Sequence, residues 1–483
     1  MKARYFLLTT ALALSSLSTH AAEVEGLPKA GEPREAKIGK AQDKSLPNGL
    51  RVIVIERPGL PLVSAEVLIN NGAETDPPRF AGLAHFTANL LKQGTTTRSA
   101  QKIATDTEAL GAKIETGSTW DGTTIKLTTL SSNLEPALGI VADLVLHPAF
   151  AKEEIERARR ETLDELLMSL EQPGTVARHV ASRATLGGSP YAHPEGGTPG
   201  SIGRITRKEI TALHDRAYRP GNSFLILTGN VSAPEAFALA EKVFGDWKAP
   251  SVEAKFTPYP APTLGRVILV DMPTAGQAAV YLAAPGIQRQ ALDLFPGKVA
   301  NALLGGGYSS RLNQEVRVKR GLSYGAASSL STWRGEGLFV AGAQTKNESA
   351  AEVVKVIQAE IERLGKEAAP EDYLKTRQAV LTGAFARDLE TNEGYVKRVS
   401  DLALYGLPLD RMESYVADVD RTKPDDLQTF AAKHFPADHI NIVVAGQGKI
   451  IEKTLRAAFP KLEVIPLSKL DLDSPTLRAP GKH

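Results

Sequence analysis

The sequence predicts an α+β fold made of two copies of one unit, because three local patterns recur at a spacing of roughly 215 residues. The recurring patterns are a proline turn that leads into an apolar strand (217–229 and 433–446), a short strand (51–54 and 266–269) and a helix that ends in an aromatic residue (Phe244 and Phe459). One such repeated pattern is expected by chance, whereas three at the same spacing indicate that one structural unit is duplicated. Residues 247–265 separate the copies and contain four prolines, a composition typical of a linker.

Hydrophobic periodicity and turn residues predict the elements of the first copy in order. Alternating apolar residues indicate strands, and longer apolar stretches indicate helices. Gly111 fits the C-terminal cap of a helix, Trp120-Asp121-Gly122 fits the turn of a hairpin, and Pro148 separates two helices. The predicted strands are 49–55, 62–69, 113–118 and 123–130, and the predicted helices are 80–91, 100–110, 135–146 and 151–170.

Composition excludes several classes of function. The 483 residues are 42% hydrophobic and 23% charged with a net charge of +2, so no strong field attracts nucleic acid or anionic lipid. No basic run interleaved with aromatic residues is present, which also argues against nucleic-acid binding. The absence of cysteine excludes disulfides, thiolate metal sites and cysteine nucleophiles.

The N-terminus predicts export. Residues 1–4 are basic, residues 5–17 are apolar, and small residues precede a return to polarity at Glu23. This pattern is typical of a secretory signal peptide cleaved near Ala21 or Ala22, and the apolar stretch is too short to span a bilayer. An uncleaved anchor is the alternative. No later stretch is long and apolar enough to cross a membrane, so we expect a periplasmic protein that is soluble after cleavage.

The run 82–91 contains part of a metal-binding pattern. In the pattern H-x-x-E-H, a helix places two imidazoles one turn apart, and the carboxylate between them acts as general base on a zinc-bound water. Here His85 supplies the first imidazole, but Ala88 stands at the carboxylate position and Asn89 at the second imidazole position. Taken alone, His85 also fits an ordinary histidine of an amphipathic helix.

The surrounding residues resemble the zinc-site helix of the pitrilysin/insulinase family of metallopeptidases. The resemblance rests on Gly82-Leu83-Ala84-His85-Phe86 and on Lys92-Gln93-Gly94-Thr95, and it extends to 147–150, 218–222 and the two-copy layout. It implies that each copy is an α/β sandwich, an antiparallel-rich mixed sheet with helices packed on it. It also implies that the whole chain forms half of a clamshell.

The same resemblance shows which metal-site residues are missing. The family's third zinc ligand is a glutamate in a Glu/Arg-rich helix, and Glu165 falls at that position, while a supporting glutamate would fall on Ala158. His85 and Glu165 are therefore remnants of a site that lacks one ligand and the general base. Two ligands rarely hold zinc tightly, so we expect no metal cofactor in this chain. Residual metal binding by His85 and Glu165 is the alternative.

The second copy contains a glycine-rich run followed by an arginine and a tyrosine. A bare triplet such as Gly305, Gly306 and Gly307 usually marks a turn, and the lysine-serine ending of a phosphate loop is absent. In context the run resembles the family's second-half motif, whose arginine and tyrosine contact substrate backbone and help stabilise the oxyanion. Arg317 and Tyr324 occupy those positions, and both side chains donate hydrogen bonds. A surface arginine and a core tyrosine are the alternative interpretation.

The resemblance implies a division of labour between two chains. Some bacterial members of the family consist of a zinc-bearing subunit and a second subunit with the arginine–tyrosine pair, and this sequence resembles the second. Arg317 and Tyr324 would act in trans, Gly305 to Gly307 would contact peptide, and zinc would belong to a homologous partner. The peptide would add as a strand to a sheet edge of that partner, and the equivalent edge here, 112–118, is expected to be vestigial. The alternative function is a stand-alone peptide-binding or scaffold protein.

These expectations divide the chain into six segments. They are a signal peptide (1–22), an extended lead-in (23–42), a first peptidase-like domain (43–247), a linker (248–265), a second peptidase-like domain (266–466) and a C-terminal tail (467–483).

Overall fold

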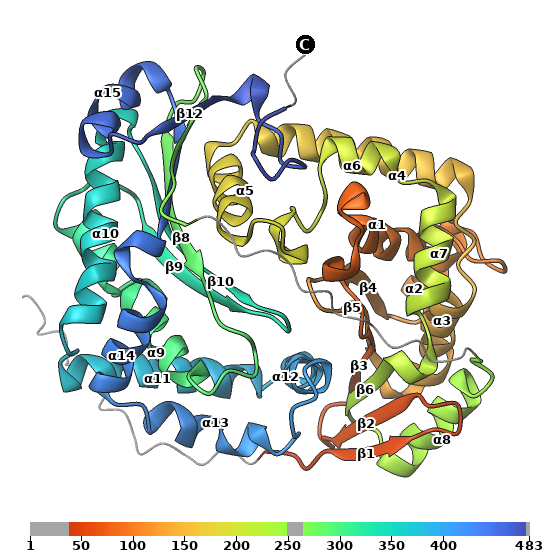
Figure 1. The fold of residues 1–483 in the computed structure, drawn as a ribbon. Helices are drawn as coiled ribbons and strands as arrows, with labels where there is room; N and C mark the ends of the chain where they lie inside the picture. Colours follow the sequence, from red (N-terminus) through yellow and green to blue (C-terminus); the bar gives the residue numbers. More distant parts are fainter. Residues whose placement is uncertain (1–37, 249–263, 480–483) are drawn as a thin grey trace, which may run out of the picture. The chain divides into compact units, whose positions relative to one another are not determined.

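The described residues form two six-stranded sheets, each built from one half of the chain (Figure 1). The structure is a computed structural model that describes residues 38–248 and 264–479. The first sheet contains β1 (Gln42–Ser45), β2 (Arg51–Glu56), β3 (Leu62–Ile69), β4 (Lys113–Ser118), β5 (Thr123–Leu130) and β6 (Ser223–Gly229). The second contains β7 (Val267–Asp271), β8 (Ala278–Pro285), β9 (Ala326–Thr332), β10 (Gly337–Thr345), β11 (Asn441–Gly446) and β12 (Glu463–Pro466).

Strand order shows that the two sheets are copies of one design. The orders are β1-β2-β6-β3-β5-β4 and β12-β7-β11-β8-β10-β9, so five strands correspond one to one. In both copies the second and third strands in this order are parallel, and the strands that follow them are antiparallel. Only the outermost strand differs, because β1 is antiparallel to β2 whereas β12 is parallel to β7. The predicted fold class, two copies of one α+β unit with mixed sheets, is confirmed.

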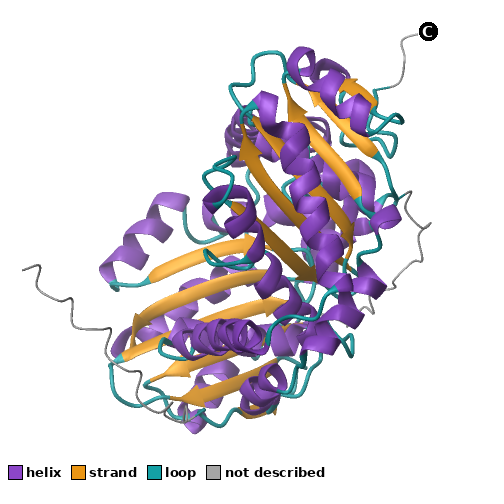
Figure 2. Cartoon of the chain, turned by 90° about the vertical axis from the view of Figure 1, so that its left-hand side faces the viewer, coloured by secondary structure: helices purple, strands orange, loops and turns teal. Residues whose placement is uncertain are grey.

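Helices pack on both faces of each sheet (Figure 2). In the first half they are α1 (Leu83–Leu90), α2 (Ala100–Ala109), α3 (Leu134–Leu146), α4 (Lys152–Leu170), α5 (Pro173–Leu186), α6 (Pro199–Arg204), α7 (Arg207–Ala217) and α8 (Ala233–Phe244). In the second half they are α9 (Leu294–Leu304), α10 (Ala350–Lys366), α11 (Glu371–Asp388), α12 (Asn392–Leu404), α13 (Arg411–Asp420), α14 (Pro424–His434) and α15 (Gly448–Ala458). Within the described residues, no helix is both long enough and apolar enough to cross a bilayer.

The predicted elements of the first copy are all present, and one helix begins later than expected. Strands β3, β4 and β5 have the predicted bounds. The helix predicted from residue 80 starts at Leu83, because Gly82 has a left-handed φ of +87° that a helix cannot continue through. The carboxylate of Asp76 accepts hydrogen bonds from the N–H groups of Gly82 and Ala84 at 2.9 and 3.0 Å, which satisfies the exposed amides of that helix start.

The two halves exchange one helix each. Successive residues of a strand face opposite sides of its sheet, so Ile53 and Val54 of β2 belong to different cores. The face of the first sheet that carries Ile53 packs against α12, which comes from the second half of the chain. The corresponding face of the second sheet packs against α5 from the first half (Figure 1). Each sheet therefore depends on the other half for part of its core.

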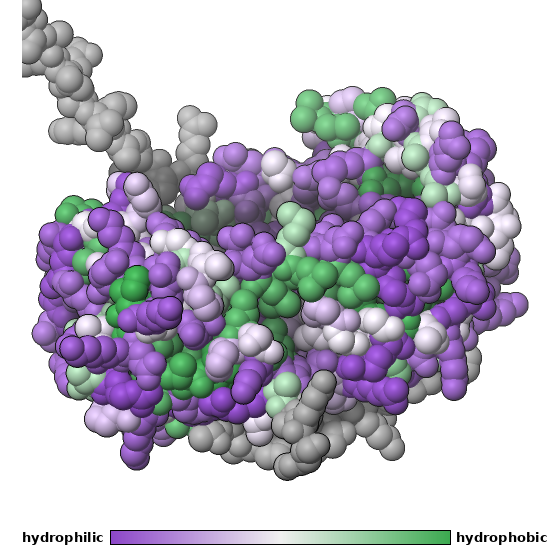
Figure 3. Space-filling model, turned by 90° about the horizontal axis from the view of Figure 1, so that it is seen from above, coloured by the Kyte–Doolittle hydropathy of each residue, from purple (hydrophilic) through white to green (hydrophobic). Residues whose placement is uncertain are grey.

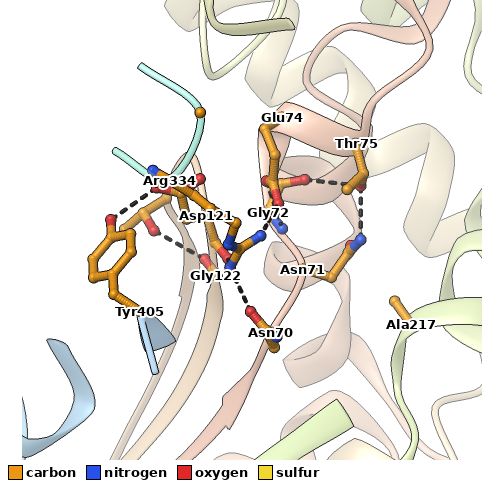
Figure 4. Close-up of polar contacts among 12 residues, drawn as sticks. Asn70, Asn71, Gly72, Glu74, Thr75, Asp121, Gly122, Ala217, Arg334 and Tyr405 are labelled. Atoms are coloured by element: carbon orange, nitrogen blue, oxygen red, sulfur yellow. Dashed lines mark hydrogen bonds and ion pairs between the residues drawn. The ribbon is translucent and has the colours of Figure 1, made fainter. Parts of the chain in front are cut away.

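Polar contacts also join segments of the two halves (Figure 4). Arg334, between β9 and β10, forms an ion pair with Glu74 at 3.0 Å and hydrogen-bonds to Asn70. The buried carboxylate of Asp121 accepts hydrogen bonds from the hydroxyls of Tyr191 at 2.5 Å and Tyr405 at 2.8 Å, and from the backbone N–H of Arg334 at 3.0 Å. These contacts fix the 119–122 turn against the β9–β10 hairpin.

The surface of the face seen in Figure 3 is mostly hydrophilic, but hydrophobic residues gather in a band across its middle. The predicted signal peptide lies outside the described residues, as does most of the predicted linker. Gln42, placed in the lead-in, pairs with Val54 as part of β1. The predicted tail packs against the first half: Leu477 is fully buried in the core that includes α5, and Arg204 forms an ion pair with Asp473 at 3.0 Å.

Candidate functional site

The metal-site remnants lie on α1 and α4 of the first half. His85 is half-buried on α1, near the backbone of Ser118 at the end of β4. Its Nδ1 atom has no hydrogen-bond partner among the described residues. Burial lowers the pKa of His85 below its usual value, although Ser118 and the negative charge of Glu165 oppose this shift. His85 is therefore a neutral imidazole at neutral pH.

The residues around His85 do not fit a zinc ion. Ala88 is fully buried on α1, so no carboxylate or water-activating group stands at its position. Asn89 offers only a neutral amide, and Glu165 is exposed on α4. In residues 38–248 and 264–479, no three or more His, Cys, Asp or Glu side chains come together in a way that could hold a metal ion. Protein zinc sites use three or four ligands, and this donor set falls short.

The glycine-rich run forms the turn at the end of α9. Gly305 caps α9, and its carbonyl accepts a hydrogen bond from the N–H of Ser328 in β9 at 3.1 Å. A β-carbon on Gly305 would lie 2.2 Å from that nitrogen, and one on Gly306 would lie 2.6 Å from the α-carbon of Ala302. Gly307 has open space around it. Gly305 and Gly306 therefore allow the turn to pack closely against its neighbours. Of the three glycines, only Gly307 has open space in which its backbone can approach a ligand.

Arg317 lies in an unusual helix. Residues Asn313–Val318 form the π-helix η7, and the N–H of Lys319 donates to the carbonyl of Gln314 at 2.9 Å, five residues back. Short π-helical segments occur often at functional sites, because the extra residue redirects a side chain. Here the guanidinium of Arg317 lies 4.8 Å from the ring centre of Tyr308, a cation–π contact that holds it beside the glycine turn.

Arg317 and Tyr324 line one open cavity with the glycine turn. The cavity has a volume of about 780 Å³, and its walls include Gly305 to Gly307, Tyr308, Arg317 and Tyr324. Tyr324 is 90% exposed, so the alternative of a core tyrosine does not hold. Neither His85 nor Glu165 lines this cavity. The structure thus brings together the predicted residues of the second copy and leaves the metal-site remnants elsewhere.

Sequence reasoning missed four residues that belong beside these sites. Tyr308, which directly follows the glycine run, was given no role, although an aromatic residue at that place is a signal for stacking. Trp120 was read as a turn residue, and Trp333 and Glu195 were not singled out. Trp120, Trp333 and Glu195 line two further cavities near the one that contains Arg317.

Family models and relatives match most of the described chain. A model described as insulinase (peptidase family M16) matches residues 51–196, and a model described as peptidase M16 inactive domain matches residues 204–381. An uncharacterized zinc protease of Mycobacterium leprae is 28% identical over 380 residues, which cover 78% of this chain and 85% of the relative. One of Streptomyces coelicolor is 26% identical over 403 residues, covering 82% and 88%.

Solved structures match the fold over a similar length. A crystal structure of a peptidase M16 inactive domain from Pseudomonas fluorescens superposes with a TM-score of 0.79 at 28% identity, covering 84% of this chain and 98% of that one. A protease from Helicobacter pylori has the same TM-score at 22% identity, covering 84% and 100%, which shows the shared fold.

Proposed function

Because the chain belongs to the insulinase family of peptidases, family M16, we propose that it is the non-catalytic subunit of an exported zinc peptidase made of two different chains. In this proposal the chain supplies Arg317 and Tyr324 to the active site of a homologous, zinc-bearing partner. The partner supplies the zinc ion and the general base. The complex hydrolyses peptides, and this chain alone does not.

One observation carries the proposal: Arg317 and Tyr324 line a solvent-open cavity, while the positions expected for a zinc ligand and a general base lack suitable side chains. Arg317 and Tyr324 share a solvent-open cavity with the glycine turn, and the side chain of Tyr324 is 90% exposed. Ala88 and Asn89 replace the base and a ligand. A chain that keeps one set of groups and lacks the other is suited to complete a site in another chain.

The chemistry of the pair suits the proposed role. A guanidinium has five N–H donors in a fixed plane, and a phenol has one O–H donor. Donors of this kind, aimed at the oxygen of a scissile carbonyl, stabilise the negative charge that develops there in the transition state. Stacking on Tyr308 limits the freedom of the Arg317 side chain, so less entropy is lost when it binds.

The peptide would lie between the subunits, as a strand added to an edge of the partner's sheet. The equivalent edge of this chain is β4, the outermost strand of the first sheet, beside His85. With no complete metal site next to it, this edge has no cleavage role in the proposal. Export to the periplasm is supported by the basic, apolar and small-residue pattern of residues 1–22.

The test is co-expression with a homologue that carries an intact H-x-x-E-H motif, followed by kinetics on a fluorogenic peptide. We expect Arg317→Ala to lower kcat/KM of the purified complex by roughly 10²–10³-fold, the range for loss of one oxyanion donor. Tyr324→Phe removes only the hydroxyl and should act in the same direction. Size-exclusion chromatography should show that both variants still assemble.

Arg320→Ala is the matched control. Arg320 follows the same π-helix and pairs with Glu315, but it does not line the cavity, so its removal should leave cleavage unchanged. Unchanged cleavage by both Arg317→Ala and Tyr324→Phe would leave the chain as a stand-alone peptide-binding or scaffold protein. A stoichiometric zinc content in the purified chain would instead restore a metal role to His85 and Glu165.

A further inference from the structure

The cavity that contains Arg317 and Tyr324 borders a second one along the face of the second sheet. The two share Tyr281, Ala327, Ser328 and Gly342, and the second has a volume of about 460 Å³. Its floor consists of residues of β8, β9 and β10, and one wall is α5. A third cavity, of about 520 Å³, shares Trp120, Glu195, Ser331 and Trp333 with the second. The three cavities are therefore neighbours, with the second lying between the other two.

Trp120, Trp333 and Glu195 stand where the second and third cavities meet. The two indole rings are 5.4 Å apart between centres, and the ring of Tyr191 stacks on Trp333 at 5.1 Å with an interplanar angle of 2°. Tyr191 is itself fixed, because its hydroxyl donates to the buried carboxylate of Asp121. The ring of Tyr191, and with it the stacked face of Trp333, is thus held in place before any ligand arrives.

Glu195 is a half-buried carboxylate without a counter-ion. It forms no hydrogen bond or ion pair with any residue in 38–248 or 264–479. Burial alone raises its pKa to about 7. An ionised carboxylate that is partly removed from water and left unpaired is unfavourable, and a bound cation relieves that cost.

A single carboxylate beside two indole rings favours an organic cation, and not a metal ion, as the ligand. A metal ion needs several oxygen or nitrogen ligands, whereas Glu195 is a single carboxylate and the described residues contain no metal-binding group of three or more acidic, His or Cys side chains. A guanidinium stacks on an indole and binds a carboxylate through two parallel hydrogen bonds, which an ammonium cannot do. An extended peptide that passed Tyr324 and followed the neighbouring cavities would reach this point.

We propose that Glu195, Trp120 and Trp333 form a subsite that binds the basic side chain of a peptide lying on the face of the second sheet, arginine in preference to lysine. This inference extends the proposed function, since it names the class of peptide that the complex would hold. Arg178 lines the same cavity without pairing with Glu195; its guanidinium instead donates to the hydroxyl of Tyr281 at 3.3 Å.

Binding to the isolated chain tests the subsite without the peptidase partner. Two of the three tryptophans of the chain are in the subsite, so intrinsic fluorescence reports on it directly. The probe is an acetylated, amidated Ala/Gly hexapeptide with one central arginine, and its matched control carries citrulline, which has the same shape and no charge. We expect the arginine peptide to bind about tenfold more tightly, and Glu195→Gln to abolish that difference. The exposed Glu171→Gln is the control variant and should preserve it.

The pH dependence supplies a second readout. Affinity for the arginine peptide should fall as the pH drops from 8 to 6, because Glu195 takes up a proton near pH 7. Burial keeps the neighbouring His179 and His193 neutral in this range by lowering their pKa values, to about 4 for His179. The other ionisable groups that line the two cavities are Arg178, Glu66, Asp121, Lys126, Lys397, Asp401, Tyr281 and Tyr405. Glu195→Gln should remove the pH dependence.

Equal affinity of the wild-type chain for the arginine and citrulline peptides would overturn the subsite, as would a Glu195→Gln variant that still discriminates between them. Neither result tests the proposed role of Arg317 and Tyr324 in peptide cleavage. Conversely, discrimination by the isolated chain together with unchanged cleavage by both Arg317→Ala and Tyr324→Phe would remove the proposed peptidase role and keep the subsite.

Discussion

Gly305, Gly306 and Gly307 are adjacent and chemically identical, but the structure gives them different roles. The first two lie where a β-carbon would collide with Ser328 or Ala302, and the third has open space. The sequence motif predicted all three as peptide contacts. Packing of the turn against β9 accounts for Gly305 and Gly306 without any ligand, so Gly307 is the position that separates a binding role from a folding role.

A pair of alanine substitutions makes that separation measurable. Gly305→Ala should lower the free energy of unfolding by about 1–3 kcal/mol, the usual cost of forcing an extra carbon into a packed site. Gly307→Ala should change it by less than about 0.5 kcal/mol, because it meets nothing within 4 Å. Urea unfolding followed by circular dichroism gives both values. Equal losses in the two variants would contradict the packing account.

The sequence alone does not predict the environment of an individual side chain. Arg317 and Tyr324 could be located because they belong to a local motif of eight residues or so, and the structure places them in one cavity. Glu195 could not be located, because its burial and its lack of a counter-ion depend on segments far away in the sequence. Residue type and spacing carry no information about either property.

At the level of elements, the β9–β10 hairpin is anchored through Arg334 to the 70–75 and 119–122 segments of the first half (Figure 4). The strands themselves were predictable from period-two alternation, and the start of α1 was not, because Gly82 adopts its left-handed conformation against Gly196 and Gly197. The hairpin contact was also out of reach, since Arg334 and Glu74 are distant in sequence and neither lies in a motif.

Removal of Arg334 should weaken the fold more at high pH than at low pH. Burial and the charge of Asp121 raise the pKa of Glu74 to about 8, while Arg334 opposes the shift. Since this pKa exceeds the unfolded value of 4.5, the contribution of Glu74 to stability is complete below pH 4.5 and is lost as the pH rises through about 8. Without Arg334 the ionised form has no cationic partner among the described residues, so the loss at pH 8.5 should exceed the loss at pH 5.

Urea unfolding of Arg334→Ala at these two pH values measures the difference. We expect a loss of about 2 kcal/mol at pH 8.5, which allows for the partial exposure of the guanidinium. In the double variant with Glu74→Gln, the extra loss at pH 8.5 should disappear, because no carboxylate remains to ionise. A loss that is the same at both pH values would show that Glu74 and Arg334 do not act as an ion pair.

At the scale of the whole molecule, the duplication was visible in the sequence and the exchange of helices was not. Offsets between repeated strands fix which segments are equivalent, but equivalent helices can pack on their own sheet or on the other one. Here α5 packs on the second sheet and α12 on the first. Five of the fully or nearly fully buried residues of the core under α12 are Ile53, Ile55, Leu68, Ile226 and Val399.

This exchange makes the two halves one cooperative unit. A buried aliphatic side chain contributes roughly 1.5–3 kcal/mol, so exposing the core under α12 would cost an amount comparable with the entire stability of a domain.

Val399→Ala in α12 and Val180→Ala in α5 form a matched pair, since both valines are fully buried. Each should destabilise by about 2 kcal/mol and leave a single unfolding transition. Hydrogen exchange should then show Val399→Ala loosening β3 and β6 of the first sheet, and Val180→Ala loosening β8 and β11 of the second. Faster exchange confined to the half that carries the substitution would mean that the exchanged helices do not couple the two sheets.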